Sequence, residues 1–368
     1  MKKNKFYVFF ILLITIFILS TAFIFNGCST GAIKKIFNSA EQEESGKDDI
    51  EYEYDAEKPE FDDEKAVDSK DNGEKENKGK SKYFYRKPLK INFTISYDIK
   101  LLGKTEKIEF TTLVPDDCEY RQNVYETVYS ITPDETFAVD SNKYVKFIIE
   151  PEDDFSINIF NEMQIFDYDL IEASRNQDYL NKEENSLSAD NLGDYTKEEN
   201  FIEKDNHQIQ EISKNFIQEN QIDLVREIYD FVLDYLKYTG YIPEDIGAVG
   251  TLKLKGGDCS CYSDLFVALC RACDIPARAV EGYTIDSRSI SIGHDWVEVY
   301  LNDLGWIPFD PTFDDSNGNS SDSTFENLKN VYVYLSFIRN DESLNNYHFY
   351  AYNYWGDNVE VTKVIEVN

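Results

Sequence analysis

Apolar and polar residues alternate along residues 83–170. The segments INFTISYDI, KIEFTTLV, YVKFIIE and FSINIF all follow this pattern, which is typical of strands with one buried face. Pro115, Pro133 and Pro151 fall between these segments, where turns are expected. We therefore expect residues 83–170 to form an antiparallel β-sandwich-like domain.

A helical pattern replaces this alternation further along the chain. In LVREIYDFVLDYLKY the apolar residues recur at spacings of three and four, as on one face of a packed helix. The members of this stripe are Leu224, Ile228, Phe231, Val232 and Tyr235. The run SDLFVALCRACDIP predicts a second helix, and RAVEGYTI, DWVEVYL and WIPFD predict strands after it. The predicted fold class is α+β, with a helix-and-sheet domain at residues 206–368 following the β-rich one.

Two segments are too polar to bury a core. Residues 28–82 include a stretch, 41–80, with 17 Asp and Glu against 7 Lys and few large apolar residues. Such a composition predicts a disordered, self-repelling tether. Residues 171–205 are also polar, and we expect them to form a connector on a surface.

The first 27 residues have the pattern of an export signal. Three lysines precede the apolar stretch Phe6–Phe25, which is followed by Asn-Gly-Cys ending at Cys28. Gly-Cys at this place resembles a bacterial lipobox, which implies that Cys28 is the lipidated first residue of the mature protein. The alternative is an uncleaved transmembrane anchor, because twenty apolar residues can also span a bilayer. Both interpretations place the rest of the chain outside the cytoplasmic membrane.

The net charge of the chain limits the classes of molecule that it can be expected to bind. The chain of 368 residues has a formal net charge of −33, whereas nucleic acids and anionic lipids are bound by cationic surfaces. We therefore expect no nucleic-acid partner, and membrane contact only through the N-terminal lipid or helix.

The segment GGDCSCYSDLFVAL contains the residues with the clearest potential for chemistry. A zinc site shared by Cys259, Cys261, Cys270 and Cys273 is unfavourable, because eleven helical residues separate the first and third sulfurs by about 16 Å. A disulfide between the first two cysteines would be strained. The last two, one turn apart among Ala and Leu, are expected to lie in the core.

Cys259 is the better candidate nucleophile. On a helical wheel it lies closer to the apolar stripe than Cys261 does. A thiol in the first turn of a helix also has its thiolate favoured by the helix dipole and by free backbone N–H groups. The same N–H groups can stabilise an oxyanion.

A candidate base and its orienting group follow in the sequence. Of the three histidines, His207 and His348 lie in segments where a surface or packing role is expected. His294 opens the strand HDWVEVYL, and the turn NDLG returns the chain toward Asp310. A hairpin of this length predicts that the imidazole and the carboxylate lie near each other, as a Cys-His-Asp triad requires.

Together these segments resemble a known family. GGDCSCYSDLFVALCRACDIPARAVEGY, HDWVEVYL and GWIPFDPT are similar to the core of transglutaminase-like proteins, a branch of the papain-like cysteine enzymes, over about 90 residues. The resemblance assigns the nucleophile to Cys259, the base to His294 and the orienting carboxylate to Asp310. In this chain Asp295 follows the histidine where small residues are commoner, and the extra oxyanion donor of related enzymes has no match. The β-rich region also resembles the domain that often precedes this core in exported bacterial members.

The resemblance implies acyl transfer through a thioester, with a protein or peptide substrate that includes cell-envelope components among its candidates. It leaves crosslinking, deamidation and proteolysis open. We expect no cofactor and no metal, because the sequence holds no calcium-loop signature. The alternative from another class is a non-catalytic cell-surface binding module with the same fold.

Overall fold

The computed structural model describes residues 88–118, 121–170, 192–285, 293–302, 304–317, 324–329 and 331–368. The predictions made for residues 1–27 and 28–82, including lipidation of Cys28, lie outside the described residues. Among the helices in the described part of the chain, none is both long and apolar enough to cross a membrane.

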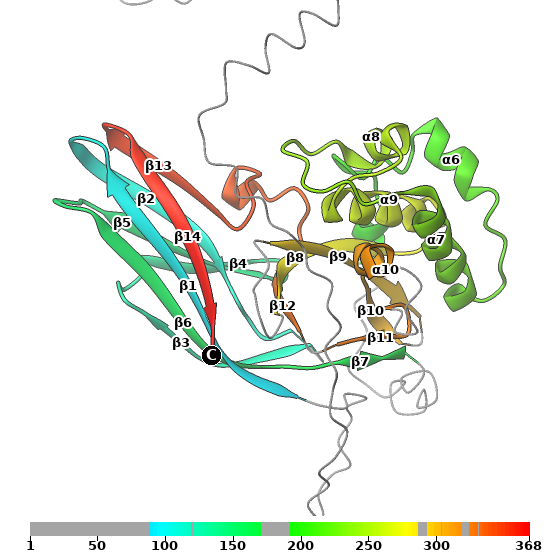
Figure 1. Cartoon of the computed structure of the whole chain (residues 1–368), viewed down its shortest axis with the longest axis horizontal. Helices are drawn as coiled ribbons and strands as arrows, with labels where there is room; N and C mark the ends of the chain where they lie inside the picture. Colours follow the sequence, from blue (N-terminus) through cyan, green and yellow to red (C-terminus); the bar gives the residue numbers. More distant parts are fainter. Residues whose placement is uncertain are drawn as a thin grey trace, which may run out of the picture. The chain divides into compact units, whose positions relative to one another are not determined.

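Two four-stranded antiparallel sheets form a β-sandwich (Figure 1). Their strand orders are β14-β1-β6-β3 and β13-β2-β5-β4. The strands are β1 (Leu89–Leu101), β2 (Thr105–Val114), β3 (Gln122–Tyr129), β4 (Glu135–Val139), β5 (Asn142–Ile149), β6 (Phe155–Ile165), β13 (Tyr350–Gly356) and β14 (Val359–Val367).

Alternation along the strands builds the core of the sandwich. In β1, every second residue from Ile91 to Ile99 is buried, while Asn92 and Asp98 between them are exposed. Across the core, the rings of Tyr97 and Phe110 lie 4.8 Å apart. The Tyr97 hydroxyl also shares a 2.6 Å hydrogen bond with Thr112 on β2, so this buried polar atom has a partner.

The C-terminal boundary predicted for the second domain is wrong. We expected residues 206–368 to form it, but β13 pairs with β2 and β14 pairs with β1 over nine residues. The helix-and-sheet region is therefore inserted between strands of the sandwich, which draws on both ends of the described chain. Alternation along a strand carries no information on its pairing partner, so the return of the last two strands to the sandwich was not predictable from it.

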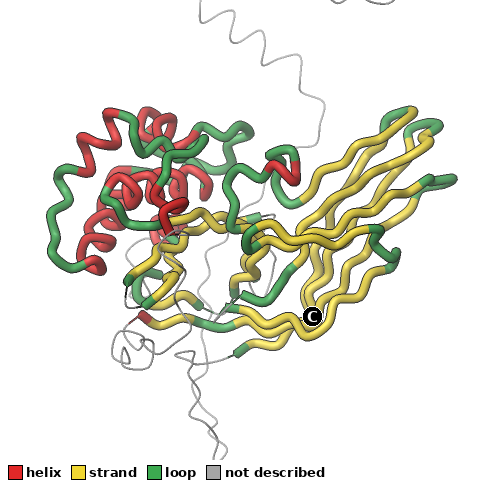
Figure 2. Tube along the Cα trace, turned by 180° about the vertical axis from the view of Figure 1, so that it is seen from behind, coloured by secondary structure: helices red, strands yellow, loops and turns green. Residues whose placement is uncertain are grey.

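The inserted region has a sheet of order β10-β9-β8-β12, and Figure 2 shows its helices gathered on one side. The sheet strands are β8 (Ala277–Thr284), β9 (His294–Leu301), β10 (Gly305–Phe309) and β12 (Tyr332–Ser336). The helices are α6 (His207–Ser213), α7 (Gln221–Tyr235), α8 (Gly247–Leu254), α9 (Cys259–Ala272) and α10 (Pro311–Asn317). Short elements complete it: β7 (Tyr168–Asp169) paired with β11 (Asn327–Leu328), and the 3₁₀ turns η1 (Gly193–Thr196) and η2 (Glu342–Leu344). The predicted α+β fold class is confirmed.

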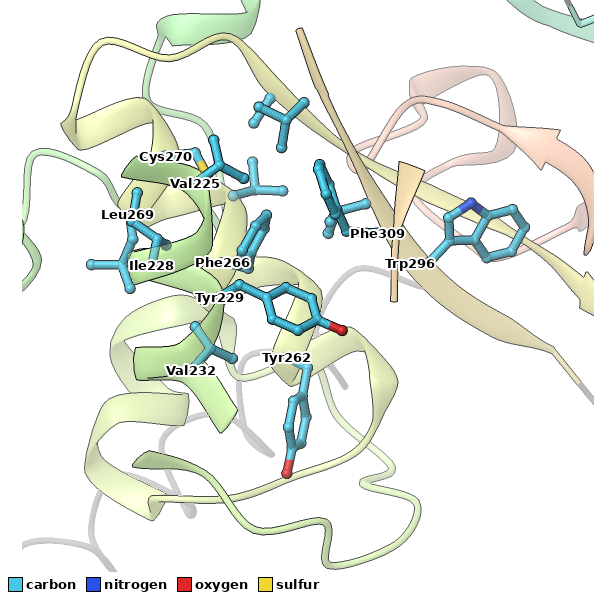
Figure 3. Close-up of a cluster of buried hydrophobic side chains, with 14 of the residues drawn as sticks. Val225, Ile228, Tyr229, Val232, Tyr262, Phe266, Leu269, Cys270, Trp296 and Phe309 are labelled. Carbon is cyan, nitrogen blue, oxygen red and sulfur yellow. The ribbon is translucent and has the colours of Figure 1, made fainter. Parts of the chain in front are cut away.

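Helix α9 lies at the centre of this region, in contact with β8, β9 and the helices α6, α7, α8 and α10. Figure 3 shows side chains of α7 and α9 packed against each other, with Phe309 from the sheet. The most deeply buried positions of α7 are Val225, Ile228, Tyr229 and Val232. The predicted stripe included Ile228 and Val232, but its other members are only partly buried, so the buried face is rotated slightly from the one expected.

Candidate active site

The loop before α9 places Cys259 at the first position of the helix. Asp258 is the N-cap, and its carboxylate accepts hydrogen bonds from the Ile242 N–H at 2.8 Å and the Ser260 hydroxyl at 2.8 Å. An N-cap side chain of this kind fixes where a helix begins. The first N–H groups of α9 then have no carbonyl partner within the helix, and the helix dipole favours an anion there.

The two glycines before Asp258 are required by close packing. Gly257 has φ +155°, and a Cβ built on it would lie 2.4 Å from the Cys261 sulfur. A Cβ on Gly256 would lie 2.5 Å from the carbonyl oxygen of Lys237. The GGDC segment therefore brings the chain close to its neighbours so that Cys259 stays partly exposed, whereas Cys261 is buried.

His294 and Asp310 meet at one end of the β9–β10 hairpin. The register pairs Val297 with Phe309, which places the start of β9 beside the residue that follows β10. The His294 Nε2 lies 2.6 Å from the Asp310 Oδ2. Because Nε2 is engaged by the carboxylate, Nδ1 is the ring nitrogen left to face the Cys259 thiol. The two groups lie close enough for each to shift the pKa of the other. The structure thus brings together the three residues that the sequence singled out.

Asp310 is completely buried and held from several sides. The Tyr332 hydroxyl donates to Oδ2 at 2.7 Å, and the Phe313 N–H donates to Oδ1 at 3.0 Å. The Asp310 carbonyl accepts from the hydroxyl groups of Thr324 at 2.7 Å and Tyr229 at 3.1 Å. These contacts fix the carboxylate that orients the imidazole.

Sequence reasoning missed Tyr332. It lies in an aromatic strand, YVYLS, where each tyrosine fits an ordinary core position. The strand pairing that brings Tyr332 to the triad joins β12 with β8, and no motif in the sequence marks it.

Burial and the neighbouring charged groups have opposite effects on the pKa values of His294 and Asp310. Burial lowers the pKa of His294, but the Asp310 charge and its hydrogen bond outweigh that effect and raise the pKa well above its ordinary value. Burial also acts to raise the pKa of Asp310, yet His294, Tyr332 and the Phe313 N–H lower it overall. The Asp310 carboxylate therefore stabilises the imidazolium that forms when His294 accepts a proton.

The surroundings of Cys259 disfavour ionisation of its thiol overall. Burial raises the pKa of Cys259, and the nearby Asp295 carboxylate adds to this, while the hydrogen bond with His294 and the imidazole charge lower it. The net effect is a pKa above the ordinary thiol value. His294 is thus the ionisable group that promotes ionisation of Cys259, together with the Asp295 backbone N–H.

The other cysteines lie away from this arrangement. Cys270 is buried and Cys273 partly buried near the far end of α9, and these two thiols form no disulfide. In the part of the chain that the structure describes, no group of His, Cys, Asp and Glu is arranged to hold a metal ion.

Comparisons with known proteins agree with the geometry. Residues 210–311 match the model of the transglutaminase-like superfamily. An uncharacterized protein of Bacillus subtilis (strain 168) is 32% identical in an alignment of 114 positions, which covers 26% of this chain and only 16% of that protein.

One solved structure shares the fold, and another was matched with a lower score. A protein of Cytophaga hutchinsonii described as a candidate cysteine protease has a TM-score of 0.55 at 18% identity, covering 78% of this chain and 92% of its own. The periplasmic domain of TgpA from Pseudomonas aeruginosa has a TM-score of 0.32 at 14% identity, covering 60% of this chain and 90% of its own. Residues 210–311 of this chain are therefore a transglutaminase-like core domain.

Proposed function

We propose that this chain is a cysteine enzyme that acts on amide groups of proteins or peptides. The observation that carries the proposal is the arrangement of Cys259, His294 and Asp310: a partly exposed thiol at a helix start, an imidazole beside it and a buried carboxylate 2.6 Å from the far ring nitrogen. This is the geometry of an activated nucleophile with an oriented base.

The reaction follows from that geometry. His294 takes the thiol proton as the Cys259 sulfur attacks the amide carbonyl, and Asp310 stabilises the imidazolium. Collapse of the tetrahedral intermediate breaks the C–N bond, the imidazolium gives its proton to the leaving nitrogen, and a thioester remains. Attack by an amine or by water on the thioester then releases the product and the thiol. The N–H groups at the start of α9 are suited to stabilise the developing oxyanion.

We also propose where the enzyme acts. Lysines, an apolar stretch and Gly-Cys precede the acidic segment, a pattern that supports anchoring by a lipid on Cys28 or by an N-terminal helix. The catalytic region would then work on the outer face of the cytoplasmic membrane, on proteins or peptides of the envelope.

The test uses the full chain with dimethylated casein and a biotinylated alkylamine. Amine incorporation indicates crosslinking chemistry, ammonia release without incorporation indicates deamidation, and new peptide fragments indicate proteolysis. Each is expected to disappear in Cys259→Ala. If the wild-type chain shows none of the three but binds casein as well as Cys259→Ala does, the enzyme proposal is wrong and a binding module takes its place.

A further inference from the structure

A carboxylate lies directly beside the catalytic pair. Asp295 follows His294 on β9, and its backbone N–H and its carboxylate both lie close enough to Cys259 to affect the pKa of the thiol. In the β8–β9 register Asp295 lies opposite Glu281, as Gly282 lies opposite His294. Like charges directly across a strand pair destabilise each other. The pair Asp295 and Glu281 is therefore unfavourable for stability, and such unfavourable pairs are expected mainly at functional sites.

The other ionisable groups around Asp295 have partners. Arg339 binds Asp264 at 2.7 Å and Asp245 at 2.8 Å. Each of these carboxylates therefore has the same guanidinium as its counter-ion.

His348 compensates Glu281. Its Nδ1 lies 2.6 Å from a Glu281 carboxylate oxygen, and its Nε2 lies 3.6 Å from Asp245. A continuous series of ion pairs therefore connects Asp264 in the middle of α9 with Glu281 on β8, through Arg339, Asp245 and His348. Within the described ranges, no hydrogen bond or ion pair reaches the carboxylate of Asp295.

The largest charges acting on Asp295 come from Glu281 of β8, His294 of β9, and Arg339 and His348 in the segment between β12 and β13, and Asp295 in turn acts on Cys259 of α9. Burial and the Glu281 charge raise the pKa of the Asp295 carboxyl, and the cations oppose them. Once ionised, Asp295 disfavours a negative charge on the Cys259 sulfur and favours a positive charge on the His294 ring.

We propose that Asp295 is a positioning residue that holds protons on Cys259 and His294, and so sets the pH range in which the reactive thiolate–imidazolium pair exists. The inference rests on the proposed function, because it assigns a role within the same catalytic pair. Asp295 acts through its charge on two neighbouring groups and makes no bond to substrate.

The test follows both titrations in the full chain. The ionisation of Cys259 is read from its rate of alkylation by iodoacetamide against pH. That of His294 is read from the ring ¹³C signals, since the chain has only three histidines and His294→Ala identifies the one required. Because the two groups interact, the measured values are the lower and upper pKa of the pair.

In Asp295→Asn we expect both values to fall, the upper by roughly one unit and the lower by less, because Asp295 is fully ionised only in the upper range. Asp295→Glu, which keeps the charge, should stay close to wild type. Asp274→Asn, at the far end of α9, is the matched control and should change neither value. A merely structural role would not lower both values together and be rescued by Glu.

An upper value that stays or rises in Asp295→Asn would overturn the inference. That failure differs from failure of the proposed function, in which wild type and His294→Ala would show the same alkylation profile. Circular dichroism of each variant checks that the fold is retained.

Discussion

Strand β9 holds two carboxylates in opposite situations. Glu298 is 1% exposed and binds Arg278 at 2.6 Å and Arg121 at 3.3 Å. The two guanidinium groups also lie over aromatic rings, Arg278 at 4.2 Å from the Trp306 centroid and Arg121 at 5.0 Å from that of Tyr168. Asp295, three residues earlier, lies beside the reactive thiol with no counter-ion bound to it among the described residues.

This comparison distinguishes Glu298, whose charge stabilises the fold, from Asp295, whose charge can influence the reactive groups. A buried carboxylate is tolerated when cations and hydrogen bonds compensate it, and Glu298 has them. Arg121 lies just before β3 of the sandwich, so this cluster also links the sandwich to the inserted region. Asp295 is partly exposed and has no hydrogen bond or ion pair among the described residues, although Arg339 and His348 act on it from a distance, so its charge can act on Cys259 and His294.

The largest expected effect is on catalysis. Cys259→Ala removes the nucleophile, and acyl transfer should fall by at least about a thousandfold, measured as amine incorporation or peptide cleavage. Cys273→Ala, a partly buried thiol at the other end of the same helix, should retain the activity. Comparable losses in both variants would contradict the assignment of the nucleophile.

The next effect is on stability. Glu298→Ala leaves two buried guanidinium groups without their carboxylate, and the free energy of unfolding should fall by about 3–5 kcal/mol, measured by urea denaturation. Asp295→Asn removes a carboxylate whose charge the folded state disfavours, so the free energy of unfolding should not fall and should rise near neutral pH. If the two variants lost equal stability, the contrast between the two carboxylates would be wrong.

A smaller effect is expected at the triad's buried tyrosine. Tyr332→Phe removes the hydroxyl that donates to Asp310 Oδ2, and the turnover rate should fall by about tenfold, corresponding to roughly 1.4 kcal/mol for one hydrogen bond to a charged group. The same substitution at Tyr241, which is 82% exposed, is the control and should have no effect. If Tyr332→Phe and wild type had equal turnover rates, the Tyr332 hydroxyl would make no contribution to catalysis.

The smallest effect is a pH-dependent one at His348. The hydrogen bonds to Asp245 and Glu281 raise its pKa to about 11, so its stabilising contribution is complete below the unfolded value, about 6.5, and is lost as the pH rises toward 11. The side chain is 47% exposed, which limits the contribution to about 1 kcal/mol or less. His348→Gln should therefore reduce the free energy of unfolding at pH 6 and much less at pH 10. If the free energy of unfolding fell equally at both pH values, His348 would stabilise the fold by packing and not by its charge.

Local patterns predicted most of what lies close in sequence. The alternation of β1 and the apolar spacing of α7 follow from one buried face per element, and the short turn after β9 made the approach of His294 and Asp310 predictable. The contacts that escaped prediction join distant segments: β14 with β1, Tyr332 with Asp310, and Arg339 with Asp264. Each depends on tertiary pairing, which periodicity does not encode.

The measurement that tests the account most directly is the pH dependence of Cys259 alkylation in wild type and in His294→Ala, with each modified cysteine mapped by mass spectrometry. If the imidazole promotes ionisation of the thiol, the midpoint for Cys259 should move to higher pH by roughly one unit or more in the variant, while that of Cys118 stays unchanged. A Cys259 midpoint that is the same in both proteins would contradict the catalytic pair, and with it the proposed function.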